Sequence, residues 1–181
     1  MGAGWPPPSW FAELGLVRAE YERAGRLEEV LSRVEELSAR TVVFDVEPLV
    51  AYWDSGQEAL DQGVARLALR AGQLPEVQLV CFATNSMRRP QAVPHSAGAR
   101  VVYLASAGKP MRIAPYQDFP KPGVVVGDQI ATDGLLARRL GYAFVQYRPP
   151  QDEIPAGPQL LRQLGRLIRP VAFRRPGRSQ R

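Results

Sequence analysis

The chain has 181 residues, of which 45% are hydrophobic, so it is long and apolar enough for one domain with a proper core, and global disorder is excluded. Its net charge of +5 is unevenly placed: residues 1–158 contain 16 basic and 18 acidic residues, whereas the last 23 residues contain seven arginines and no acid. A nearly neutral domain with a cationic tail is not the pattern of a nucleic-acid binder that is basic throughout.

The chain has one cysteine, Cys81, and one histidine, His95. A single cysteine excludes an internal disulfide framework and a Cys-based zinc site. His95 stands in a loop-like Pro-His-Ser segment, which does not favour a Ser-His-Asp triad. No stretch reads as a signal peptide, and none approaches the roughly 18 apolar residues of a membrane span, so we expect a cytoplasmic protein.

The N-terminal part is expected to be an arm followed by a helix, over residues 1–40. Residues 1–12 are rich in proline, glycine and tryptophan and predict an irregular arm. From about Leu14 to Leu37, leucine and valine recur at helical spacing, which predicts helix, with Gly25 as a point that divides it in two. This helical extension is expected to pack on the domain that follows.

Short apolar runs predict five buried strands, at residues 41–45, 78–84, 100–104, 123–128 and 142–147. Helical patterns over 57–71 and 133–140 lie between them, and Gly141 is a typical helix-ending residue. Continuously apolar strands that alternate with helices are typical of a parallel sheet covered on both faces. We therefore predict an α/β domain over residues 41–150 with a five-stranded parallel sheet.

Polar side chains follow four of these strands, and the carboxyl ends of parallel strands meet at one edge of a sheet, where ligands bind. They are Asp45 and Glu47, then Thr84 and Asn85, then Lys109, and finally Asp128 and Asp133. These residue types suit phosphoryl transfer: one carboxylate attacks phosphorus, acids bind Mg²⁺, and a hydroxyl and an amine hold the phosphate oxygens. A second acid protonates the leaving group and then activates water.

The order Asp-x-acid, Thr, Lys and Gly-Asp-x₄-Asp resembles the haloacid dehalogenase (HAD) phosphatase superfamily, over about residues 41–148. Within it, the chain is most similar to the capless IIIA-type subgroup, called YqeG-like and related to phosphatidylglycerophosphate phosphatases. The matching segments are Thr84-Asn85-Ser86, Lys109-Pro110, Gly127-Asp128-Gln129 through Thr132-Asp133, and Arg139-Leu140-Gly141-Tyr142. The resemblance implies a Rossmannoid three-layer sandwich without a cap domain.

The resemblance also implies a role for each acid of the site. Asp45 is expected to be the nucleophile and a Mg²⁺ ligand. Glu47 is expected to be the acid/base and to offer its backbone carbonyl to the metal. Asp128 is expected to bind the metal directly, and Asp133 to support it from outside the ligand shell.

For the phosphate, the resemblance implies Thr84 and Asn85 as binding residues and Lys109 as the group that neutralises its charge. The stretches from Glu47 to Gln57 and from Ser86 to Gly98 are too short to form a cap. An open site suits a phosphate carried by something bulky, such as a lipid headgroup, a nucleic acid or a protein.

The first motif departs from the usual Asp-x-Asp-x-Thr of the family, because the chain reads Asp45-Val46-Glu47-Pro48-Leu49. Glu47 adds a methylene, and a displacement of about 1 Å can lower a rate about a hundredfold. Leu49 removes a supporting hydroxyl, and Pro48 stiffens the turn. These departures leave open a catalytically weak HAD-like protein that binds phosphate or metal.

Residues 160–171 have the spacing of an amphipathic helix, with arginines 162, 166 and 169 on its polar side. A basic helix of this kind is typical of contact with an anionic membrane surface or a partner, and the alternative is docking on the domain. Residues 174–181 are expected to be disordered, and residues 151–181 form the third part of the predicted organisation.

The sequence thus predicts a Mg²⁺-dependent phosphatase that hydrolyses a phosphomonoester through an aspartyl phosphate, cytoplasmic or peripheral to the inner face of the membrane. By resemblance, the leading substrate is a lipid phosphate such as phosphatidylglycerophosphate. The alternatives are a nucleotide or polynucleotide phosphatase and the catalytically weak binding protein.

Overall fold

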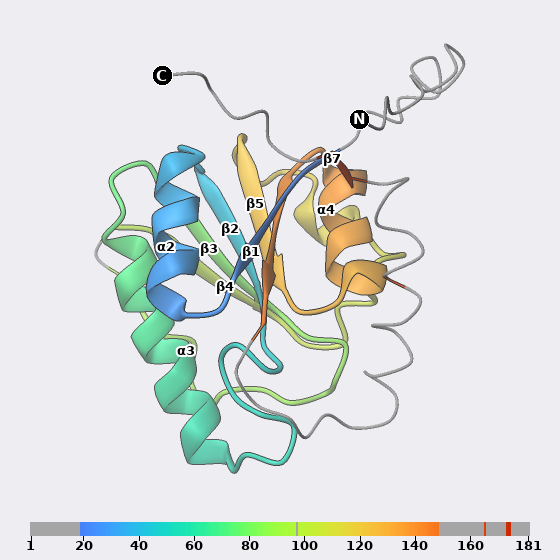
Figure 1. The fold of residues 1–181 in the computed structure, drawn as a ribbon. Helices are drawn as coiled ribbons and strands as arrows, with labels where there is room; N and C mark the ends of the chain where they lie inside the picture. The colour runs from blue at the N-terminus through green and yellow to red at the C-terminus, as the bar shows by residue number, and fades with distance from the viewer. Residues whose placement is uncertain (1–18, 97, 149–164, 166–172, 175–181) are drawn as a thin grey trace.

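The computed structural model describes residues 19–96, 98–148, 165 and 173–174, which form an α/β structure around a parallel sheet (Figure 1). Its strands run in the order β4-β3-β2-β5-β6-β1-β7, and every pair of neighbours is parallel. The strands within these residues are β1 (Ala19–Ala24), β2 (Thr41–Asp45), β3 (Leu79–Ala83), β4 (Arg100–Leu104), β5 (Gly123–Gly127), β6 (Ala143–Tyr147) and β7 (Phe173–Arg174).

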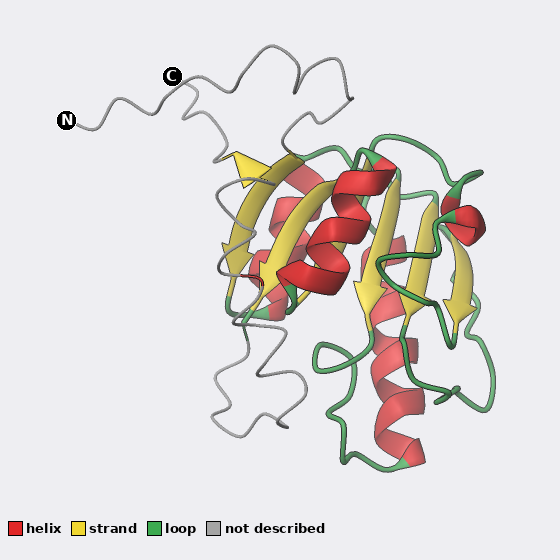
Figure 2. Ribbon diagram, turned by 90° about the vertical axis from the view of Figure 1, so that its right-hand side faces the viewer, coloured by secondary structure: helices red, strands yellow, loops and turns green. Residues whose placement is uncertain are grey.

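Helices cover both faces of the sheet and make three layers, with α2 and α3 on one face and α4 on the other (Figures 1 and 2). The α-helices are α2 (Leu27–Glu36), α3 (Gln57–Gly72) and α4 (Leu135–Leu140), and two shorter turns are the 3₁₀ turn η1 (Ala114–Tyr116) and the π-helical turn η2 (Ile130–Gly134). Gly141 ends α4 in a left-handed conformation with φ 70°, as expected for a glycine after a helix.

The core is divided in two by the sheet, and the alternation of side chains along β2 shows the division. Val42 and Phe44 pack in the cluster under α2 and α3, whereas Val43 packs in the cluster under α4. All three are fully buried. A strand buried on both faces needs apolar residues at every position, which is why the strand is a continuous apolar run.

The five predicted strands are confirmed, although β4 at the edge of the sheet is only partly buried, and the predicted helix is confirmed over residues 27–36. The predicted number of strands is wrong, and so is the helix over residues 19–24. Residues 19–24 form β1, which pairs with β6 from Tyr21↔Phe144 to Ala24↔Tyr147, and the helix begins only at Leu27. β1 and β7 extend the sheet to seven strands. Local helical spacing is a weak signal, and the unpaired edge of β6 offers backbone hydrogen bonds that override it.

The path of the chain creates a crevice between β2 and β5. From β2 the chain moves outward to β3 and β4, then crosses back to β5 on the other side of β2 and continues outward to β6. Ligands in open α/β sheets bind outside the carboxyl ends of the strands at such a reversal. The described residues that follow β2 and β3, residues 46–56 and 84–99 without 97, form no helix or strand over the crevice.

The predicted arm over residues 1–12 lies outside the described residues, as do the predicted C-terminal helix and tail apart from Gly165, Phe173 and Arg174. Gly165 is buried, and a Cβ added there would lie 2.9 Å from the Cβ of Ile130 in η2. The ring of Phe173 lies 5.6 Å from that of Phe144. Among the described residues, no helix combines the length and apolar character needed to cross a membrane.

Candidate functional site

A cavity of about 180 Å³ lies at the carboxyl ends of β2, β3 and β5, the place that the topology predicts. Its lining includes five of the seven site residues predicted from the sequence, and Asp128 and Asp133 lie beside it. The lining residues are Asp45, Glu47, Trp53, Thr84, Asn85, Ser86, Lys109, Gln129 and Thr132.

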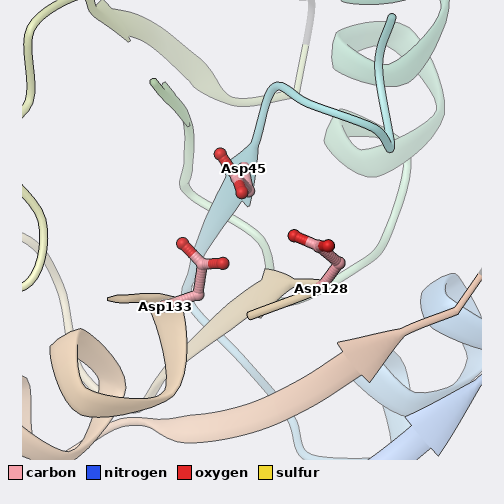
Figure 3. A group of neighbouring side chains, drawn as sticks. All are labelled: Asp45, Asp128 and Asp133. Carbon is pink, nitrogen blue, oxygen red and sulfur yellow. The ribbon is translucent and has the colours of Figure 1, made fainter. Parts of the chain in front are cut away.

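Three buried aspartates meet beside this cavity (Figure 3). Asp45 ends β2, Asp128 follows β5, and Asp133 lies in η2, and one carboxylate oxygen from each lies within 4.8 Å of the others. Asp128 and Asp133 are 1% and 0% exposed, so water does little to screen their charge. Several carboxylate oxygens at one point are the ligands that Mg²⁺ prefers, so the donor set fits a divalent cation.

Asp133 reaches this group because of two local features. The π-helical turn, in which the Gly134 N–H donates to the Gln129 carbonyl at 3.2 Å, directs the Asp133 side chain back toward β5. Gly127, at the end of β5, leaves the space: a Cβ there would lie 2.3 Å from Asp133 Oδ2. Asp133, expected outside the metal's ligand shell, therefore lies within the group of possible ligands.

Lys109 is the cation of the site, and it is buried with a 2% exposed side chain. Its Nζ donates to Asp45 Oδ1 at 2.7 Å, to Asp133 Oδ1 at 2.7 Å and to the Ala83 carbonyl at 3.0 Å, so all three ammonium hydrogens have an acceptor. Asn85 holds the lysine's backbone: it accepts from Lys109 N at 2.8 Å and donates to Lys109 O at 2.9 Å. The amide predicted to bind phosphate thus also fixes the loop that carries the lysine.

Burial and neighbouring charge shift the pKa values of the buried groups in defined directions. Burial raises the pKa of Asp45 well above its usual value, the Asp133 carboxylate raises it further, and Lys109 only partly opposes this. Burial alone would lower the pKa of Lys109, but Asp133 and Asp45 outweigh it and raise that pKa, so the ammonium stays charged. Three acids around one cation leave an excess of negative charge that a divalent cation would offset.

Glu47 lines the cavity next to Asp45 but lies outside the group of three aspartates. Its carboxylate accepts from Thr84 Oγ1 at 2.7 Å and from Ser86 Oγ at 3.3 Å, and Arg88 Nη1 lies 3.6 Å from its Oε1. Thr84 Oγ1 also lies 2.9 Å from Ser86 Oγ, and its single hydrogen can serve only one of the two acceptors at a time. The side chain of Glu47 thus reaches the loop after β3, where Thr84 and Ser86 lie.

Two residues that are not among the candidates named from the sequence, Trp53 and Arg88, lie at the site. Trp53 is half-buried and lines the cavity. The Arg88 side chain is 24% exposed and donates hydrogen bonds to two backbone carbonyls of the loop after β2, whereas its neighbour Arg89 is exposed. Arg88 and Arg89 are adjacent in the sequence and look alike there. Only the position of the loop in the structure shows which of the two contacts the site.

Comparisons of the chain with protein-family models, with curated proteins and with solved structures find no match. The chemistry of the site therefore has to be argued from its own side chains.

Proposed function

We propose that this protein is a Mg²⁺-dependent phosphatase that hydrolyses a phosphomonoester through an aspartyl phosphate on Asp45. The observation that carries the proposal is the meeting of three buried aspartates and a fully buried lysine at a cavity on the carboxyl edge of a parallel sheet. The strand order on either side of β2 is that of doubly wound nucleotide-binding folds, which agrees with the resemblance to capless HAD phosphatases.

Asp45, Asp128 and Asp133 would hold the metal, because each offers a carboxylate oxygen within 4.8 Å of the other two. A Mg²⁺ ion bound there would neutralise charge on the phosphoryl oxygens and so make the phosphorus atom easier to attack. Lys109 orients the nucleophile, since its ammonium fixes Oδ1 of Asp45 at 2.7 Å.

In the first step, a carboxylate oxygen of Asp45 forms a bond to phosphorus and the ester P–O bond breaks. The departing oxygen takes a proton from the Glu47 carboxyl group, which lines the same cavity. In the second step, Glu47 takes a proton from water, the water oxygen attacks phosphorus, and the bond to Asp45 breaks. Inorganic phosphate leaves, and Asp45 and Glu47 return to their starting states.

The space available suits a phosphate on a larger molecule. A cavity of about 180 Å³ holds a phosphoryl group with little of its leaving group, and the described residues after β2 and β3 form no helix or strand to enclose more. The remainder of the substrate would lie outside, as for a lipid phosphate or a nucleic acid.

The alternative of a catalytically weak binding protein draws on one observation. The carboxylate of Glu47 is held by Thr84 and Ser86 and lies near Arg88, and a side chain held in this way is less free to reach a leaving group.

The test is Mg²⁺-dependent release of p-nitrophenol from p-nitrophenyl phosphate. Asp45→Asn should reduce release to background, because the amide is a poor nucleophile, whereas Asp54→Asn, at an exposed position of the same loop, should retain it. Wild-type release no greater than that of Asp45→Asn would refute the phosphatase.

Two variants at position 47 separate the phosphatase from the weak binding protein. Glu47→Gln should lower kcat by on the order of a hundredfold or more if Glu47 moves the protons. Unchanged turnover would remove it from that role. If the added methylene misplaces the carboxyl group, Glu47→Asp should raise turnover.

A further inference from the structure

Among the nine residues that line the cavity, Trp53 is the one with an apolar side chain. The other eight carry carboxylates, amides, hydroxyls or an ammonium, which suit a metal ion and the phosphoryl oxygens. A leaving group that extends out of the cavity therefore meets one apolar surface among the described lining residues, the indole of Trp53. Trp53 is half-buried, so part of that surface is accessible.

Trp53 lies in a turn whose backbone carbonyls, one before and one after Trp53, accept hydrogen bonds from Arg88. Arg88 Nη1 donates to the Tyr52 carbonyl at 2.8 Å, and Nη2 donates to the Ser55 carbonyl at 2.7 Å. The turn is also closed on itself, because Tyr52 N donates to Ser55 Oγ at 3.0 Å and Ser55 N donates to Tyr52 O at 3.1 Å. The indole thus projects from backbone that is already ordered, which lowers the entropic cost of using it for binding.

Arg88 connects this turn to the reacting groups. Its backbone N donates to Ser86 Oγ at 3.3 Å, its carbonyl accepts from Tyr103 Oη at 3.1 Å, and its Nη1 lies 3.6 Å from Glu47 Oε1. Arg88 is not itself among the lining residues. It is a positioning residue that holds Trp53 and Glu47 in one arrangement.

Resting on the proposed function, we propose that Trp53 contacts the leaving group and makes the site selective for phosphomonoesters whose leaving group carries an aromatic ring, as that of a nucleotide does and that of a glycerol lipid phosphate does not. A flat ring offset over the indole gains stacking energy beyond the area that it buries, whereas a short alkyl group does not. Arg88 maintains this selectivity through its two bonds to the turn.

The kinetic test compares kcat/KM for phenyl phosphate and ethyl phosphate. Trp53→Ala should lower the value for phenyl phosphate by about tenfold, mainly through KM, and change that for ethyl phosphate by less than about twofold, because only the aryl ring loses a stacking partner. Trp53→Phe should retain most of the preference. An equal loss for both substrates in Trp53→Ala, or a wild-type preference that is independent of position 53, would overturn the proposal.

Arg88→Lys should shift selectivity in the same direction, because a single ammonium cannot reproduce the fork that reaches both carbonyls. The matched control is Arg89→Lys, at the exposed neighbouring position, which should leave the ratio of the two kcat/KM values unchanged. Unaltered selectivity in Arg88→Lys would overturn the positioning role.

A binding measurement separates this proposal from the proposed function. In a Trp5→Phe/Trp10→Phe background, Trp53 is the single tryptophan, and its fluorescence reports directly on the cavity wall. With Mg²⁺, phenylphosphonate should alter the emission and bind about tenfold more tightly than methylphosphonate. Such a result in a protein without turnover would refute the phosphatase and retain the aryl site. Turnover with no effect of phenylphosphonate on Trp53 would retain the phosphatase and overturn the aryl site.

Discussion

The ammonium of Lys109 and the carboxylate of Asp133 lie 2.7 Å apart, and their side chains are 2% and 0% exposed. The same ammonium lies 2.7 Å from Asp45 Oδ1, so one cation serves two buried acids, one at the end of β2 and one in η2. A buried ion pair of this kind contributes little net stability, but the loss of one partner leaves an uncompensated charge in the interior. The pair is therefore a sensitive place to test the site.

Lys109→Met should destabilise the protein at pH 8 by about 3 kcal/mol or more, because two carboxylates lose their counter-ion. The chain supplies a matched control in its other lysine, Lys121, which is exposed, so Lys121→Met should change stability by less than about 0.5 kcal/mol. Urea denaturation measures both free energies of unfolding. Similar values for the two variants would contradict the buried pairing.

Mg²⁺ should raise the melting temperature of the wild-type protein, because a ligand that binds only the folded state stabilises it, by about 2.7 kcal/mol at a hundred times its Kd. Asp128→Asn removes a candidate ligand and should abolish most of this shift, whereas Asp118→Asn, at an exposed position, should retain it. Scanning fluorimetry with a Mg²⁺ titration checks both. A full shift in Asp128→Asn would exclude that carboxylate as a ligand.

Gly127→Ala should destabilise the protein by about 1–3 kcal/mol, because the added methyl group forces a buried neighbour to move. The clash is with Asp133, whose Oδ2 would lie 2.3 Å and whose Cγ would lie 2.4 Å from the new Cβ. Gly56→Ala is the control, since nothing lies within 4 Å of a Cβ there. Chemical denaturation measures the effect. Equal stability of the two variants would show that Asp133 can move freely.

Alkaline pH should destabilise the protein through Cys81, whose pKa is raised to about 12 by burial, against an opposing effect of Lys109. The unfolded thiol ionises near pH 8.5, so the unfolded state binds fewer protons than the folded state above that pH. This contribution is complete below about pH 8.5 and falls by ~1.4 kcal/mol per pH unit until the folded thiol ionises. Cys81→Ala should therefore have a flatter decline in stability between roughly pH 9 and 11. An unchanged slope would contradict a buried thiol.

The sequence determined the elements whose local pattern matches their environment. β2, β3 and β5 are buried at every position because both faces of the sheet are covered there, so burial is visible in the residues themselves. The meeting of Asp45, Lys109 and Asp128 follows from the same pattern, since the carboxyl ends of parallel strands share one edge.

Only the tertiary structure decided the rest. β1 carries a helical pattern in its sequence and becomes a strand because β6 offers an edge. Asp133 reaches Asp45 because a π-helical turn and the missing Cβ of Gly127 direct it there. Arg88 rather than Arg89 clamps the turn of Trp53, because two loops from different strands meet at its guanidinium. Each outcome depends on contacts between segments far apart in the chain, which a local pattern does not contain.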